Sequence, residues 1–296
     1  MAKAKTKLSE VAEEFRELDL VFKSGSDLDV VERGYGRKLI HAISSQNGIL
    51  KCEALKSLGD LYLHKAKVNK DIAENLKRAC VLYKKLLRFY KSKNEKETVQ
   101  HRIKYAEKYT KLVQNENSLK PRTENPASIT LAVSLTLHEV KEKTKMKGHG
   151  TSPLIEGYTN SFVEAIAGRN KRLEIESLKS LGDLYLEKGR VGKEQAAFMK
   201  SAGLYRAALD RCEDSAGRET LKHRLKYAEK VKEKEAMKAM QHLETRSTRK
   251  KKGSNANWLT STPKSTHGTG DVIGRRNYGG AYKEHLQEGC RAMQTG

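Results

Sequence analysis

The sequence predicts an all-α fold, in which helical hairpins repeat along a solenoid and a disordered basic linker follows at the C-terminus. Three observations support this prediction. Only four prolines occur among 296 residues, so long stretches lack helix breakers. Apolar residues recur at helical spacing. One long segment occurs twice, which is the signature of a repeat architecture.

The duplication is the strongest of these signals. Leu55–Leu63 recurs unchanged as Leu178–Leu186, and His101–Lys108 recurs as His223–Lys230 with one substitution. The offset between the copies is 123 residues before residue 73 and 122 after it, so the second copy lacks a single residue. Nine identical residues in register with such flanks indicate a true internal repeat.

Each copy is expected to be a run of antiparallel helices. Leu55, Leu58, Gly59 and Tyr62 fall at i, i+3, i+4 and i+7, which is one face of a helix. Gly25-Ser26-Asp27 predicts a helix stop followed by the cap of the next helix. In the first copy the predicted helices are 8–23, 27–46, 50–66, 70–92 and a return helix 95–113.

The two copies divide the chain into five predicted parts. Copy 1 is 8–113, a polar linker is 114–130, and copy 2 is 131–244. Residues 245–277 are basic and rich in Gly, Ser and Thr, which predicts a disordered linker. Residues 278–296 resemble the first helix of a further copy, so we expect a truncated third copy and a chain that is a fragment.

The repeat resembles a known family. Leu181-Gly182 followed by Tyr185, then the turn Lys188-Gly189 and an Ala-rich second helix, resembles the tetratricopeptide (TPR) repeat in a long-period variant found in uncharacterised animal proteins. The resemblance implies that the small Gly182 lets the paired helix approach closely, and that the array binds other proteins. TPR domains that clamp a carboxylate use Gly-Asn here. This chain has Gly-Asp at 59–60 and 182–183, and an Asp would repel that ligand.

Nothing in the sequence indicates catalysis, so we expect a protein that is not an enzyme and uses no cofactor. Asp60 and Asp183 have no second acid or base beside them by spacing, which favours polar helix positions. Gly268–Gly274 lacks the flanking elements and the Lys-Ser/Thr of a phosphate loop. The histidines and the four cysteines show no metal-ligand spacing, so no metal site and reduced thiols are expected.

The net charge of +22 favours anionic partners. We therefore predict a protein–protein interaction scaffold or adaptor that binds a protein or peptide, with an acidic segment as the expected ligand. The candidate partner-binding residues are Lys56, Arg102, Lys104, Lys179, Arg224 and Lys226. The run Arg249, Lys250, Lys251 and Lys252 is a candidate nuclear import signal or anion-binding arm.

Two alternatives stay open beside the scaffold. The first is a nucleic-acid-binding helical repeat, which predicts a steep loss of affinity with salt. The second is the regulatory repeat region of a larger signalling protein. No apolar run is long enough to span a bilayer, so membrane insertion is not expected. A cytoplasmic location is predicted, with the nucleus as an alternative because of the basic run.

Overall fold

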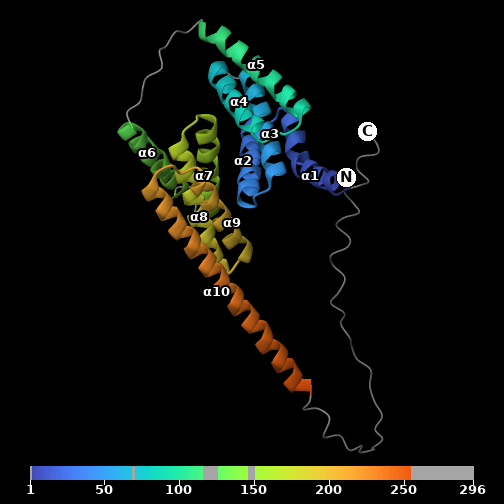
Figure 1. Cartoon of the computed structure of the whole chain (residues 1–296), viewed down its shortest axis with the longest axis vertical. Helices are drawn as coiled ribbons and strands as arrows, with labels where there is room; N and C mark the ends of the chain where they lie inside the picture. The colour runs from blue at the N-terminus through green and yellow to red at the C-terminus, as the bar shows by residue number, and fades with distance from the viewer. Residues whose placement is uncertain (1, 69–70, 116–125, 146–150, 255–296) are drawn as a thin grey trace, which may run out of the picture. The chain divides into compact units, whose positions relative to one another are not determined.

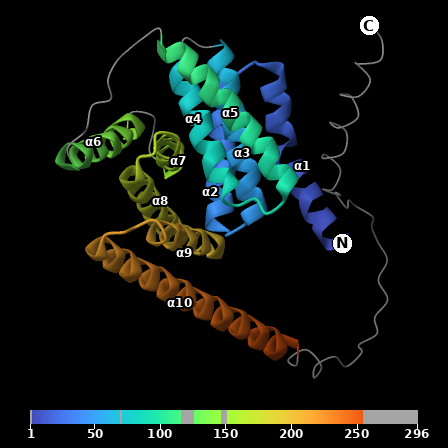
Figure 2. The same cartoon turned by 45° about the horizontal axis from the view of Figure 1, so that its top comes forward.

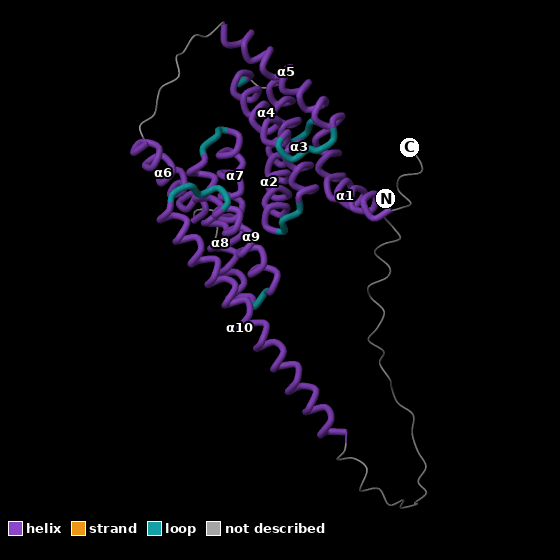
Figure 3. Tube along the Cα trace, in the orientation of Figure 1, coloured by secondary structure: helices purple, strands orange, loops and turns teal. Residues whose placement is uncertain are grey.

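All regular secondary structure in the described residues is α-helical, which confirms the predicted fold class (Figures 1 and 3). The computed structural model describes residues 2–68, 71–115, 126–145 and 151–254. The helices are α1 (Ala2–Ser24), α2 (Leu28–Ser44), α3 (Gly48–Val68), α4 (Ile72–Leu87), α5 (Lys93–Asn115), α6 (Pro126–Lys145), α7 (Thr151–Ala167), α8 (Lys171–Gly192), α9 (Gln195–Leu209) and α10 (Ser215–Ser254).

The local signals place the boundary between α1 and α2 as predicted, whereas α1 begins at Ala2 and not at residue 8. Gly25 has φ +67°, a left-handed conformation that glycine adopts without strain, and it ends α1. Asp27 caps α2 because its Oδ1 accepts hydrogen bonds from the backbone N–H groups of Asp29 and Val30, at 3.0 and 2.9 Å. Asn47 and Asn170, which occupy equivalent positions, cap α3 and α8 through the backbone N–H groups of Leu50 and Leu173.

Two segments predicted to be linker carry helix. Within 114–130, α6 begins at Pro126, where a proline at a helix start loses no hydrogen bond. Within 245–277, α10 continues to Ser254, since the Arg and Lys residues there are good helix formers that extend an existing helix. The remainder of that segment and the predicted third copy, 278–296, lie outside the described residues.

Glycine and tyrosine set the packing inside each copy. A Cβ on Gly59 would lie 2.6 Å from the Tyr83 ring, and a Cβ on Gly182 would lie 2.6 Å from the Tyr205 ring. Both tyrosines are fully buried. The prediction that Gly182 permits a close helix approach is therefore confirmed, and the partner is the aromatic ring of the following helix.

The two copies contact each other through equivalent helices. α2 packs on α7, its own counterpart in the other copy (Figure 2). α2 also packs on α9, and reciprocally α7 packs on α4, the counterpart of α9. This exchange of roles is the pattern that an approximate two-fold axis between the copies produces. One hydrophobic cluster consequently extends through both copies, from Leu58 and Leu86 to Leu181 and Leu204.

Individual residues repeat the pattern of exchange. Arg33 and Glu156 occupy equivalent positions, and they form a salt bridge with 3.2 Å between Nε and Oε1. Gly36 and Thr159 are also equivalent, and a Cβ on Gly36 would lie 3.3 Å from the Thr159 methyl group. If two units with the sequence of copy 1 packed together in this way, Arg33 would lie against another arginine. The charges therefore favour pairing of copy 1 with copy 2.

The chain separates into two compact units, Met1–Leu243 and Glu244–Gly296. The first unit holds both copies. Of the second unit, the structure describes only the end of α10, up to Ser254. Within the described residues, no helix combines the length and the apolar character needed to cross a membrane.

Candidate functional site

Two of the predicted partner-binding residues, Arg102 and Arg224, lie in equivalent polar clusters, one in each copy. Arg102 of α5 forms a salt bridge with Asp60 of α3, which also accepts a 2.5 Å hydrogen bond from the hydroxyl of Tyr83 of α4. The cluster thus ties three consecutive helices together. Burial, with Asp60 beside it, raises the pKa of Tyr83 well above its ordinary value. The phenol therefore stays a hydrogen-bond donor at neutral pH.

The second copy contains the same cluster. Arg224 of α10 forms a salt bridge with Asp183 of α8, and the Tyr205 hydroxyl donates a 2.5 Å hydrogen bond to that carboxylate. Both carboxylates thus have a structural task, which agrees with their interpretation as polar helix positions. The side chains of Arg102 and Arg224 are about one-third exposed, and their guanidinium groups form salt bridges within the chain.

The other predicted residues are spread over the surface. Lys56 and Lys179 form salt bridges with the glutamates three residues before them, Glu53 and Glu176. Lys104 on α5 and Lys226 on α10 are exposed. The run 249–252 belongs to α10, and its side chains lie outside the described ones. A partner site built from these lysines stays a prediction.

A different set of basic residues gathers where the copies meet. A cavity of about 690 Å³ opens there, with walls from α2, α3 and α4 of copy 1 and from α7, α8 and the end of α9 of copy 2. Its floor is apolar and includes Leu39, Ile43 and Ile166. The seven cations of its wall are Lys51, Lys84, Lys85, Arg88, Arg169, Lys171 and Arg211, and its two carboxylates are Glu174 and Asp210.

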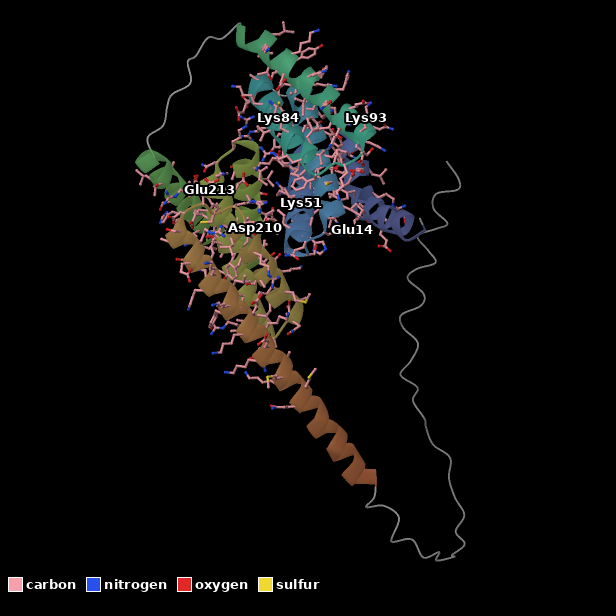
Figure 4. The ribbon with its side chains drawn as sticks, in the orientation of Figure 1. Glu14, Lys51, Lys84, Lys93, Asp210 and Glu213 are labelled. Atoms are coloured by element: carbon pink, nitrogen blue, oxygen red, sulfur yellow. The ribbon has the colours of Figure 1, made fainter. Side chains whose placement is uncertain are left out.

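One carboxylate connects the two copies across this cavity. Glu174 of copy 2 has a side chain only 5% exposed, and its Oε1 lies 2.5 Å from Nζ of Lys85 in copy 1. Its Oε2 lies 3.4 Å from Nε of Arg211. Figure 4 labels Lys51 of copy 1 and Asp210 of copy 2, which border the same cavity. Glu174 therefore neutralises part of the wall and leaves other cations uncompensated.

The uncompensated charge can be located. Glu107 pairs with Lys84 at 2.6 Å and Glu213 pairs with Lys171, both from outside the cavity wall. Seven cations then face four carboxylates, which leaves a surplus of three positive charges. Among the described residues, Lys51, Arg88 and Arg169 form no salt bridge of their own, although the Lys51 ammonium lies 4.1 Å from the centre of the Phe89 ring.

Two lysines of the wall are partly buried, and their pKa values are lowered. Burial lowers the pKa of Lys51, and the nearby Arg211 lowers it further. Burial also lowers the pKa of Lys85, although the Glu174 carboxylate acts in the opposite direction. Like charges held close together in a partly buried wall disfavour the protonated forms, so an anion placed among them would be attracted.

The positions that the two copies share do not reveal these residues. The cavity is built from positions at which the copies differ: Lys51 is equivalent to Glu174, and Arg88 is equivalent to Asp210. Both members of each pair line the cavity, as expected for a site on the approximate two-fold axis. Charge differences between otherwise similar copies were the available signal.

The described residues contain no group of three or more His, Cys, Asp or Glu side chains arranged to hold a metal ion. Comparison of the chain with models of protein families, with curated proteins and with solved structures found no match.

Proposed function

We propose that the chain is a scaffold or adaptor that binds an acidic segment of a partner protein in the cavity between its two copies. The supporting observation is the surplus of positive charge around an apolar floor, with Lys51, Arg88 and Arg169 unpaired by carboxylates of the described chain. Apolar walls with a few convergent charged groups are typical of binding sites. An extended acidic segment would place carboxylates on the cations and aliphatic atoms on the floor.

Binding in this cavity would also join the copies. The segment would contact α3 and α4 of copy 1 together with α8 of copy 2, in addition to the existing salt bridge between Glu174 of α8 and Lys85 of α4. A ligand that binds the folded chain and not the unfolded one stabilises the folded state by mass action. The scaffold is therefore expected to become more stable against unfolding when the acidic segment is present.

The test is fluorescence anisotropy of the full chain with a short labelled peptide rich in Asp and Glu. Arg88→Ala/Arg169→Ala should weaken binding at least tenfold, because a hydrogen bond to a charged group contributes about 1.5–3 kcal/mol. Lys108→Ala/Lys230→Ala is the matched control, since it removes the same charge from exposed faces of α5 and α10. It should change the affinity by less than about twofold.

Two results would overturn the proposal. Equal weakening in both variants would mean that the peptide responds to net charge and not to the cavity. Tighter binding of duplex DNA or random-sequence RNA than of the peptide, with a steep loss between about 50 and 200 mM salt, would make nucleic acid the ligand.

A further inference from the structure

The cavity concentrates its positive charge in a small space. Its volume of about 690 Å³ is within the range of sites for a single compact ligand. Three surplus positive charges lie around this volume. Neutralising them with carboxylates would require about three acidic side chains, each with its own backbone to be desolvated. A phosphate monoester carries about −1.5 to −2 on a single side chain, with three acceptor oxygens.

The donors in the wall match a phosphate. Three of the seven cations are arginines, Arg88, Arg169 and Arg211, and a guanidinium presents paired N–H groups that fit two phosphate oxygens at once. The donors come from both copies, since Lys51 and Arg88 belong to copy 1 and Arg169 to copy 2. One tetrahedral group could accept hydrogen bonds from both sides, which a planar carboxylate does less well.

Two helix N-termini reinforce the positive wall. Lys171 is the first residue of α8, and Lys51 lies in the first turn of α3, so the cavity borders the positive ends of two long helices. These termini are equivalent under the approximate two-fold relation between the copies. Burial lowers the pKa of Lys51, and the neighbouring Arg211 and Lys85 lower it further, which agrees with cations held close together in this wall.

We infer that the acidic segment bound in this cavity is phosphorylated, with the phosphate of a phosphoserine or phosphothreonine held between Lys51 and Arg88 of copy 1 and Arg169 of copy 2. This inference rests on the proposed function and adds that the scaffold reads a modification of its partner. One flanking carboxylate would complete the neutralisation of the wall. Removal of the phosphate would weaken the binding of the partner.

The experiment compares three labelled acidic peptides that differ only at the central residue, which is serine, phosphoserine or aspartate. The full chain should bind the phosphoserine peptide at least about tenfold more tightly than the other two. Arg169→Gln should remove most of this preference; glutamine is the residue that copy 1 has at the equivalent position, Gln46. Lys230→Gln, on the exposed face of α10, is the control and should retain the preference.

The outcomes separate the two proposals. Equal binding of all three peptides would overturn the phosphate inference and leave the acidic-segment scaffold standing. Absence of binding by all three would overturn both. Pyrophosphate is the competitor: if it binds as tightly as the phosphopeptide, the ligand is a free phosphate compound and not a protein segment, which overturns the inference. Unchanged preference in Arg169→Gln, with thermal unfolding showing an intact fold, would also overturn it.

Discussion

The contact between α9 and α2 can be tested at one glycine. A Cβ added at Gly203 would lie 2.0 Å from the carbonyl oxygen of Ser44 and 2.8 Å from its carbonyl carbon. These are backbone atoms near the end of a helix, so they cannot move aside as a flexible side chain could. The equivalent position in copy 1 is Val81. Glycine is therefore required at 203 only because the copies meet there.

The expected effect of Gly203→Ala follows from that distance. An ordinary carbon–oxygen contact would require the two helices to separate by roughly 1 Å, which removes contacts on both sides of the interface. Overpacking of this kind costs about 1–3 kcal/mol. It acts against the gain of about 1 kcal/mol that alanine brings to a helix. We expect the free energy of unfolding to fall, and Tm to fall by about 2–4 °C for each kcal/mol.

The assay is urea and thermal unfolding of the full chain, with hydrogen exchange of the amides in α2 and α9. Gly48→Ala is the matched control, because a Cβ there would meet no atom within 4 Å. Its stability should be unchanged or slightly higher. A Gly203→Ala protein as stable as the control, with unchanged exchange in both helices, would refute the close approach of α9 to α2.

Two further predictions concern charge and pH. Arg33→Glu and Glu156→Arg should each lower the free energy of unfolding by at most about 1 kcal/mol, since the pair is exposed, and the double variant should recover most of the loss. A double variant less stable than either single one would contradict this pairing of the copies. Burial raises the pKa of Tyr90 to about 12. The folded state thus favours the neutral phenol, and the resulting stability is complete below about pH 10 and declines as pH rises towards 12. In urea unfolding, Tyr90→Phe should make this loss of stability at alkaline pH smaller. A loss as large as that of the unchanged chain would exclude Tyr90 as its source.

The helical repeat could be predicted because its signals are local. The face of Leu55, Leu58 and Tyr62, the cap at Asp27 and the stop at Gly25 all act within a few residues, so sequence spacing locates them. The predicted boundaries of the two linkers were wrong, because the local signals there are weak. Pro126 starts a helix within the expected linker, and α10 runs on to Ser254 because neither proline nor glycine follows Leu243 before Gly253, one residue from its end.

The members of the polar clusters could be identified in the sequence, but their contacts could not be predicted from it. Asp60 and Arg102 were each singled out in the sequence, yet they are separated by a helix, and only folding brings Arg102, Asp60 and Tyr83 together. A charged side chain at helical spacing can face solvent or a neighbouring helix. The choice depends on which helices pack together, and periodicity does not contain that information.

The sequence by itself determined that the chain is helical, that it is duplicated, and that it carries a large positive charge. Tertiary structure alone decided how the two copies meet and where the charge concentrates. Lys51, Arg88 and Arg169 are separated along the chain and come together because α3 packs on α4 within copy 1 and because α2 and α4 pack on α7 of copy 2. Such contacts depend on matching surfaces of distant segments, as at Gly203 and Ser44, and each copy taken alone gives no sign of them.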